Sequence, residues 1–287
     1  MRGGSRVVKK AAVVGNPVDH SLSPDIHSFW LNEAGINGIY TKETVKHENF
    51  GSFIVNAAKK GYSGLNITVP FKEKAFKLCD VLSETAKELG AVNLIIFENG
   101  KIMGDNTDGQ GFIDSVIEKI PNLSFKKNNF SILGAGGAAK GIIHALCKNG
   151  AKNINIINRD LKKAKDLASS YSGIATPYAL SDIEKGLTDA SFLINTTTMG
   201  MKGGPDSIEI NFSEFPKIIC FTDIVYNPKT TSLMSDALKS GIKVIGGIGM
   251  LVNQAVPAFR AFYGEEPRNL DSLYLVLENK MKVDHND

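Results

Sequence analysis

The sequence has few cysteines and no pairing pattern among them. Cys79, Cys147 and Cys220 are far apart, and each stands among apolar neighbours. Structural zinc sites need closely spaced Cys or His ligands, and disulfide frameworks use an even number of cysteines. We therefore expect no metal site and no disulfide framework, and the reducing cytoplasm is the natural compartment.

Long apolar runs are also missing. No stretch approaches the roughly 20 apolar residues of a membrane-spanning helix. The basic start MRGGSRVVKK leads into AAVVG, an apolar run too short for a secretory signal. We expect no membrane partner, and we interpret the first few residues as a frayed or tag-derived start.

Neither sign of charge dominates the chain. Its 33 Lys and Arg against 30 Asp and Glu give a net charge of +3, and its Lys pairs are short and scattered. Binding to nucleic acid or to an anionic surface would require a concentrated basic patch. The expected partner is a small molecule, and the sequence leaves a monomer and a homodimer both open.

At 287 residues the chain is long enough for two domains. In its first part the strand-like runs KAAVVG, IYTKETV and GLNITV alternate with helical patterns, the first of which has Ser23 as its expected N-cap. Asn99-Gly100 between β-rich segments predicts a hairpin. The alternation predicts an α/β domain with a largely parallel sheet and an antiparallel addition at the hairpin.

A second α/β domain is predicted at about 109–245. The segment NFSILGAGGAAKGIIHALCKNG has the pattern strand, glycine turn, helix, and further strands are expected at 191–195, 218–225 and 242–245. The segment from Gly246 to the end is mostly helical, and its pattern alone does not fix where it packs.

The glycine turn fits G-x-G-x-x-A between a strand and a helix. Its first glycine permits a tight turn, its second lets a pyrophosphate approach the backbone, and the helix N-terminus offers N–H groups and partial positive charge. This context predicts a dinucleotide cofactor. The expected contacts in the turn are Gly134, Ala135, Gly136, Gly137 and Ala138.

The residues after the next strand bear on which dinucleotide is bound. Asn158-Arg159 and Lys163 take the place of the acidic residue typical of NAD sites, and cations favour the 2′-phosphate of NADP. The cations therefore favour NADP. Asp160 would repel the 2′-phosphate, however, so NAD stays open. Thr197 and Thr198, at the carboxyl end of a predicted strand, are further candidate contacts.

Four polar motifs precede the glycine turn. HSLSP places two serine hydroxyls where they could fork onto one carboxylate, NITVPFK supplies an amide, a hydroxyl and a lysine, AVN supplies an amide, and GDNTDG supplies an aspartate. Each alone is more often a helix cap, a turn or a solvated charge. Their candidate residues are Ser21, Ser23, Asn66, Thr68, Lys72, Asn93 and Asp108.

Taken in this order and ahead of the glycine turn, the motifs closely resemble those of the shikimate dehydrogenase family. The later segments DIVYNPKTTSLM and GGIGMLVNQAVPAF are also similar to family motifs, so the resemblance covers nearly the whole chain. It implies NADP-linked reversible reduction of 3-dehydroshikimate to shikimate in aromatic amino-acid biosynthesis. It also implies a substrate domain of 1–108 and 246–287, a Rossmann domain of 109–245, and a site in the cleft between them.

The resemblance also implies the roles of individual residues. Lys72 and Asp108 form the catalytic pair for proton transfer, and Ser21 and Ser23 hold the substrate carboxylate, with Tyr226 nearby. The ring hydroxyls are contacted by Thr68, Asn93, Asp108 and Gln254, and Asn66 faces the substrate. Cofactor contacts are implied for the glycine turn and for Asn158, Arg159, Asp160, Lys163, Thr197, Thr198, Met199, Ile224, Gly247, Met250 and, less directly, Glu84.

Three departures from the family pattern are visible. Ser28 and Leu94 replace a common Asn and Thr, and Asp160 replaces a Thr or Ser that helps to hold the 2′-phosphate. Two alternatives stay open: a quinate/shikimate dehydrogenase that uses NAD, and a catalytically silent nucleotide-binding relative.

Overall fold

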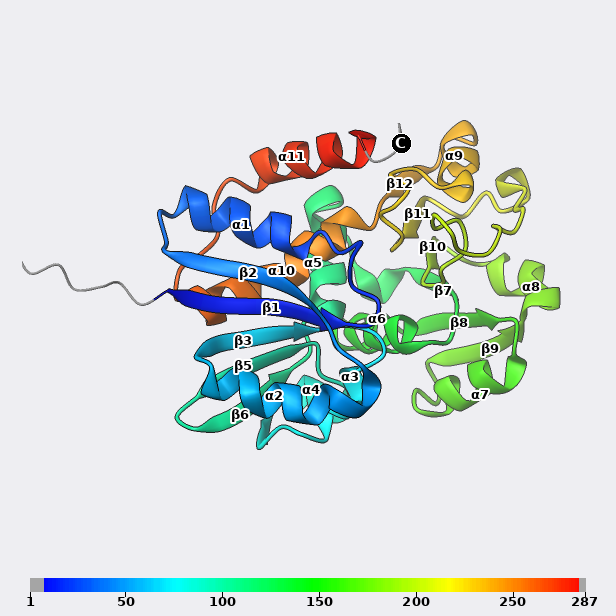
Figure 1. The fold of residues 1–287 in the computed structure, drawn as a ribbon. Coiled ribbons are helices and arrows are strands. Elements are labelled where there is room, and N and C mark those ends of the chain that lie inside the picture. The colour runs from blue at the N-terminus through cyan, green and yellow to red at the C-terminus, as the bar shows by residue number, and fades with distance from the viewer. Residues whose placement is uncertain (1–7, 284–287) are drawn as a thin grey trace, which may run out of the picture. The chain divides into compact units, whose positions relative to one another are not determined.

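This computed structural model describes residues 8–283, so the predicted frayed start and the last residues of the predicted C-terminal segment lie outside the described part. The chain divides into two compact units. The first contains the described residues up to Thr107 together with Gln254–Lys280, and the second contains Asp108–Asn253 and the described residues from Met281 on. Helix α10 (Ile248–Tyr263) carries the chain from the second unit back to the first (Figure 1).

The first unit is built on a mixed sheet with the strand order β2-β1-β3-β5-β6-β4. β1, β2 and β3 pair in parallel, and β5 joins β3 and β6 in antiparallel fashion. Its other elements, in chain order with the strands, are β1 (Lys9–Gly15), α1 (Ser23–Glu33), β2 (Gly38–Thr44), η1 (His47–Asn49), α2 (Phe50–Lys59), β3 (Tyr62–Ile67), α3 (Lys72–Phe76), β4 (Val81–Leu82), α4 (Glu84–Leu89), β5 (Leu94–Glu98), β6 (Lys101–Asp105) and the C-terminal α11 (Leu270–Val283).

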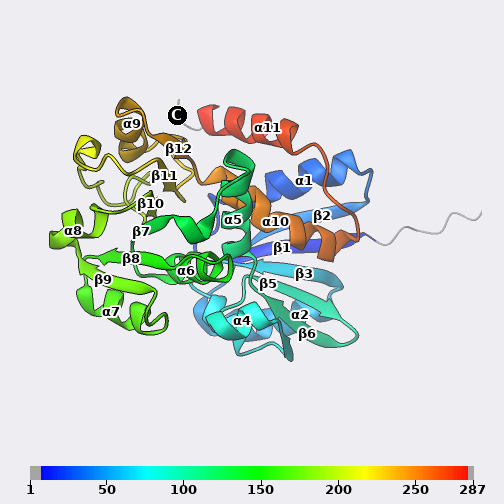
Figure 2. The ribbon, with the colours of Figure 1, turned by 180° about the vertical axis from the view of Figure 1, so that it is seen from behind.

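Helices cover both faces of this sheet. On one face α2, α3 and α4 bury apolar residues such as Phe50 and Phe71 against β1, β3 and β5. On the other face α1 and α10 supply an aromatic cluster in which Trp30, Phe259 and Phe262 are buried (Figures 1 and 2). Gly64 of β3 has no room for a Cβ atom, which would lie 2.3 Å from the Phe262 ring.

Two local predictions in this unit have opposite outcomes. Asn99 and Gly100 both have positive φ, at 51° and 75°, so they form the predicted turn between β5 and β6. The prediction that Ser23 caps α1 is wrong. Leu22 occupies the N-cap position, and Ser23 is the first helical residue, whose hydroxyl accepts a hydrogen bond from Ser21 Oγ.

The second unit holds a fully parallel sheet with the strand order β12-β11-β10-β7-β8-β9. Chain order reverses between β7 and β10, and ligands of open α/β sheets bind at the carboxyl ends of strands at such a point. The elements are α5 (Asp108–Lys119), η2 (Phe125–Lys127), β7 (Asn129–Leu133), α6 (Gly137–Lys148), β8 (Asn153–Asn158), α7 (Leu161–Ser169), β9 (Ala175–Ala179), η3 (Leu180–Asp182), α8 (Ile183–Leu187), β10 (Phe192–Asn195), η4 (Phe212–Glu214), β11 (Cys220–Asp223), α9 (Ser232–Lys239) and β12 (Lys243–Ile245).

Two apolar layers hold this sheet. One combines α5, α6 and α7 with inward residues such as Phe130 and Ile156, and the other combines α8 and α9 with residues such as Leu193 and Phe221. The predicted two-part α/β architecture with mainly parallel sheets is confirmed. None of the described helices is both long and apolar enough to cross a membrane.

Candidate active site

The serine motif forms one local structure at the start of α1. Ser21 Oγ lies 3.2 Å from both the hydroxyl and the backbone nitrogen of Ser23. Ser23 is buried, whereas Ser21 is half-buried. The Ser23 hydroxyl is also hydrogen-bonded to the phenol of Tyr40 on β2. Two hydroxyl groups therefore stand side by side, as a fork onto a carboxylate would require.

Tyr40 connects the serines to Asn66 on β3. Its phenol donates to Asn66 Oδ1 at 2.8 Å, and its ring stacks on the His27 imidazole with a centroid distance of 3.9 Å. Burial raises the pKa of Tyr40 well above its ordinary value, so the phenol stays protonated and remains a donor. Tyr40 thus holds Asn66 and the serine motif in one network.

Asn93 is fixed by a second network. Its amide nitrogen donates to Thr107 Oγ1 at 3.0 Å, and its carbonyl oxygen accepts the Thr107 backbone N–H at 2.8 Å. The Thr107 hydroxyl then donates to the backbone carbonyl of Gln254 at 2.9 Å. Asn93, the end of the GDNT segment and the start of the returning chain are therefore tied together, although they are distant in sequence.

The segment that connects β3 to α3, with the first residue of that helix, contains Thr68 and Lys72. The Thr68 backbone N–H donates to Val14 O at 2.9 Å, and the chain then turns so that Phe71 N–H donates back to Thr68 O at 3.0 Å. Lys72 is the first residue of α3, half-buried, and its carbonyl accepts the Val92 N–H at 2.9 Å. That bond places Lys72 next to the segment that leads into Asn93.

The glycine turn connects β7 to α6. Gly134 has φ +110°, and a Cβ atom there would lie 2.6 Å from Thr196 Oγ1, so only glycine fits. Gly136 and Gly137 meet nothing within 4 Å where their Cβ atoms would be. Open space therefore lies above the N-terminus of α6, where backbone N–H groups can receive an anion.

A pocket of about 300 Å³ adjoins the glycine turn. It lies at the carboxyl ends of β7, β8 and β10, where the sequence predicted the cofactor. Its lining residues are Leu133, Gly134, Ile157, Asn158, Arg159, Leu180, Thr197, Thr198, Met199, Pro205 and Asp206.

Asp160 has a structural role beside this pocket. Its carboxylate is the N-cap of α7 and accepts the backbone N–H groups of Lys162 at 2.9 Å and Lys163 at 3.4 Å. The Asn158 amide donates to Asp160 O at 2.9 Å. The carboxylate of Asp160 therefore lies at the N-terminus of α7, where the partial positive charge of the helix attracts it.

The remaining candidate residues are divided between the two units. Glu84 is exposed at the start of α4 in the first unit. Asp108 begins α5 and belongs to the second unit. Tyr226 follows β11, and burial raises its pKa. The other second-unit candidates, near the end of β11 and the start of α10, are Ile224, Gly247 and Met250.

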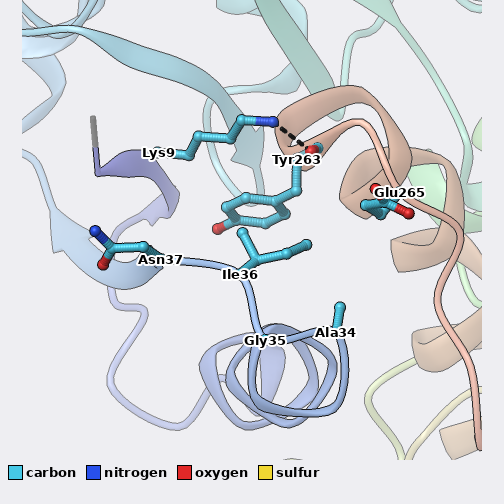
Figure 3. Close-up of a pocket in the computed structure, with 7 residues that line it drawn as sticks. All are labelled: Lys9, Ala34, Gly35, Ile36, Asn37, Tyr263 and Glu265. Atoms are coloured by element: carbon cyan, nitrogen blue, oxygen red, sulfur yellow. Dashed lines mark hydrogen bonds between the residues drawn. The ribbon is translucent and has the colours of Figure 1, made fainter. Parts of the chain in front are cut away.

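A second pocket, of about 250 Å³, lies at the amino ends of β1 and β2, away from these candidates (Figure 3). Lys9 Nζ donates to the Tyr263 carbonyl at its edge, and Glu265 and Asn37 line it. It contains no residue that the sequence singled out. Among the described residues, no group of three His, Cys, Asp or Glu side chains could hold a metal ion.

Comparison with known proteins shows which family the chain belongs to. Residues 13–95 match the model of the shikimate dehydrogenase substrate binding domain, and residues 115–201 match that of shikimate / quinate 5-dehydrogenase. The chain is 38% identical over 267 residues to shikimate dehydrogenase (NADP(+)) of Brucella abortus, covering 92% of each chain. The protein belongs to the shikimate dehydrogenase family.

Solved structures of the family share the fold. Shikimate 5-dehydrogenase from Thermus thermophilus, in complex with NADP(H) and shikimate, is 31% identical with a TM-score of 0.82, over 96% of this chain and all of that one. Quinate dehydrogenase from Corynebacterium glutamicum, in complex with NAD, is 28% identical with a TM-score of 0.84, over 93% and 97% of the two chains.

The structure adds site residues that the sequence analysis of this family member missed. Tyr40 and Thr107 organise the candidate substrate residues, and Asp206 lines the pocket at the glycine turn. Thr107 stands within the quoted GDNTDG motif, so its position beside Asp108 was a usable signal. Tyr40 and Asp206 carried no comparable signal, because their roles depend on contacts between distant segments.

Proposed function

We propose that this protein catalyses the NADP-dependent, reversible reduction of 3-dehydroshikimate to shikimate, a step of aromatic amino-acid biosynthesis. The observation that carries the proposal is the match to the Brucella abortus enzyme named shikimate dehydrogenase (NADP(+)), which covers 92% of both chains. A match of this extent covers far more of the chain than a shared nucleotide-binding domain alone would.

The second unit fits a dinucleotide phosphate. The open space above Gly136 and Gly137 suits a pyrophosphate at the α6 N-terminus, and Arg159 at the pocket offers a cation to the 2′-phosphate. When bound, NADP supplies the hydride chemistry. In this proposal residues 109–245 form the cofactor domain.

The first unit supplies groups that match a hydroxylated ring acid. The paired hydroxyls of Ser21 and Ser23 suit the carboxylate, and Asn66, Thr68 and Asn93 suit the ring hydroxyls. Each amide is held by other protein groups, so little conformational freedom would be lost on binding. In the proposal residues 1–108 and 246–287 form the substrate domain, to which Gln254 contributes.

Lys72 and Asp108 carry the proton transfer in this proposal. Reduction of a ketone requires a proton at the developing alkoxide oxygen, and oxidation requires a base that removes it. Lys72 Nζ moves that proton, and Asp108 orients the ammonium and the substrate hydroxyl as a coupled partner. We further propose that the enzyme works in the cytoplasm, as a monomer or a homodimer.

Initial rates with four substrate and cofactor combinations test this function: shikimate or quinate, each with NADP or NAD, followed by absorbance of the reduced nucleotide. We expect the highest kcat/KM for shikimate with NADP. Higher kcat/KM for quinate with NAD would instead support the second candidate, which the similarity to the Corynebacterium glutamicum enzyme favours. No turnover with any pair would support a silent relative.

A further inference from the structure

A buried carboxylate lies where two strands of the second unit end together. Asp223 is the last residue of β11 and pairs in register with Asn195, the last residue of β10. Its side chain has no exposed surface, and burial raises the pKa of this carboxyl despite its hydrogen bonds. A buried carboxylate costs free energy unless partners compensate for lost hydration, so its partners indicate what it does.

Both carboxylate oxygens of Asp223 accept hydrogen bonds. Oδ1 accepts from Asn195 Nδ2 at 3.0 Å and from the Val225 backbone N–H at 3.0 Å. Oδ2 accepts from the Thr231 hydroxyl at 2.8 Å, and that hydroxyl also caps α9. Asp223 therefore connects the end of β10, the turn after β11 and the start of α9.

Asn195 is hydrogen-bonded both to Asp223 and to the loop that lines the proposed cofactor pocket. Its Nδ2 faces Asp223, which can only accept, so its Oδ1 faces the loop after β10. There it accepts the Thr197 N–H at 3.1 Å and the Thr197 hydroxyl at 2.7 Å. Thr197 Oγ1 in turn accepts the Met199 N–H at 3.1 Å. Both Thr197 and Met199 line the pocket.

We propose that Asp223 is a positioning residue that holds the 197–199 loop, through Asn195, in the conformation that binds the nucleotide cofactor. The identity of that nucleotide rests on the proposed function, whereas the positioning of the loop does not. In the ligand-free structure the Thr197 hydroxyl donates to Asn195 Oδ1, and its oxygen accepts the Met199 N–H, so both partners fix the side chain.

Asp223→Leu and Asp223→Asn test this role, with Ser131→Ala as the matched control. Ser131 is fully buried within β7, and its hydroxyl donates to Gly186 O at 2.6 Å, away from the loop. Hydrogen exchange of the Thr197 and Met199 amides in the ligand-free protein is the direct readout, because both N–H groups are bonded within the network. The NADPH dissociation constant and the KM for shikimate are measured on the same variants.

In Asp223→Leu we expect both amides to exchange about 10-fold faster and NADPH to bind about 10-fold more weakly, as loss of hydrogen bonds to a charged group implies. The KM for shikimate should change less than NADPH binding, because, of the proposed substrate residues, only Tyr226 lies in the turn that Asp223 holds. Asp223→Asn keeps one acceptor and should show about a three-fold effect on each quantity. Ser131→Ala should lower the melting temperature and leave both loop amides and NADPH binding unchanged.

Unchanged exchange of the two amides in Asp223→Leu would overturn the proposal. The proposal would also fail if Ser131→Ala and Asp223→Leu lower the melting temperature equally and weaken NADPH binding equally. If Asp223→Leu does not fold, the Asp223→Asn measurements decide by the same criteria. If the unsubstituted protein fails to bind NADPH, the proposed cofactor is wrong, and the exchange rates still decide whether Asp223 holds the loop.

Discussion

Lys72 occupies an electrostatically unfavourable position. It is the first residue of α3, a short helix in which Glu73 follows it, and a cation near a helix N-terminus is disfavoured. The Lys72 carbonyl accepts the Val92 N–H, which fixes the Lys72 backbone close to Asn93. The proposed role in proton transfer would account for a half-buried lysine at this position.

Lys72→Ala should lower kcat by about 100-fold or more, the range of general acid–base catalysis, with a much smaller change in the KM for shikimate. Steady-state kinetics measure both constants. Lys74→Ala is the matched control, because Lys74 lies on the same helix and its ammonium donates to His47 O at 2.6 Å. Near-normal kcat in Lys72→Ala, or equal losses in both variants, would contradict the assignment.

Asp160 caps α7, and its negative charge should repel the 2′-phosphate of NADP. Asp160→Thr retains a capping side chain and removes the negative charge. Two charges at contact distance in water interact by about 1 kcal/mol. NADPH should therefore bind about two- to five-fold more tightly to the variant at low salt. Titration of NADPH at two salt concentrations measures this, and salt should reduce the gain.

Asp160→Asn separates charge from side-chain shape in this experiment, because asparagine also caps helices. A similar gain in Asp160→Asn assigns the effect to charge, and NAD affinity should change in neither variant. Unchanged or weaker NADPH binding in Asp160→Thr would show that the cap already offsets the repulsion.

At the scale of elements, α1 is held by a buried histidine. His27 is fully buried, stacks on Tyr40 of β2, and neither ring nitrogen has a hydrogen-bond partner in the described chain. Burial lowers its pKa to about 3. The imidazole is therefore neutral, and it serves as an aromatic contact between helix and sheet rather than as an acid or base.

This histidine should make stability depend on pH. The unfolded chain binds a proton at His27 below about pH 6.5, whereas the folded protein does not until about pH 3. The stability that neutral His27 contributes is thus complete above pH 6.5 and is lost as pH falls toward 3, by up to about 1.4 kcal/mol per pH unit.

Urea denaturation of the unsubstituted protein and His27→Phe at pH 7 and pH 5 checks this. Between these values the unsubstituted protein should lose about 2 kcal/mol more unfolding free energy than the variant, which keeps a ring against Tyr40 but cannot be protonated. Equal losses in both proteins would show that His27 is protonated in the folded state or lies open to water.

Elements defined by local chemistry could be predicted from the sequence. The Asn99-Gly100 turn and the glycine turn at Gly134 follow from backbone conformations that few residues adopt. Short elements without a strong pattern were missed, including α4 and the edge strand β9, which contains Pro177.

The candidate site could be predicted only where a motif holds the residues close in sequence. The contact of Tyr40 with Asn66 joins positions 26 apart, and that of Asn195 with Asp223 joins positions 28 apart. Asn195 and Asp223 pair in register on neighbouring strands, whereas Tyr40 on β2 reaches Asn66 on β3 across β1. Both contacts depend on strand order and register, which are set by packing of the whole sheet. The family resemblance supplied the roles of single residues, but it did not supply the side chains that hold them.

At the scale of the whole molecule, the proposed function puts most substrate residues in the first unit and most cofactor residues in the second. Each ligand should therefore stabilise mainly its own unit. A ligand that binds only the folded state adds about 2.7 kcal/mol of stability at 100 times its dissociation constant. Amides near that ligand should therefore exchange more slowly. We expect saturating shikimate to slow exchange around residues 21–23 and 66–68, and saturating NADP to slow it around 134–138 and 195–199.

Hydrogen exchange with each ligand alone measures this division directly. Methyl shikimate, which lacks the carboxylate charge, is the control for the serine motif and should protect 66–68 while leaving 21–23 close to the ligand-free rate. Protection by NADP confined to the first unit, or by shikimate confined to the second, would contradict the proposed domain roles. The predicted pattern instead assigns substrate recognition to side chains that the first sheet holds in register and nucleotide recognition to the strand ends of the second.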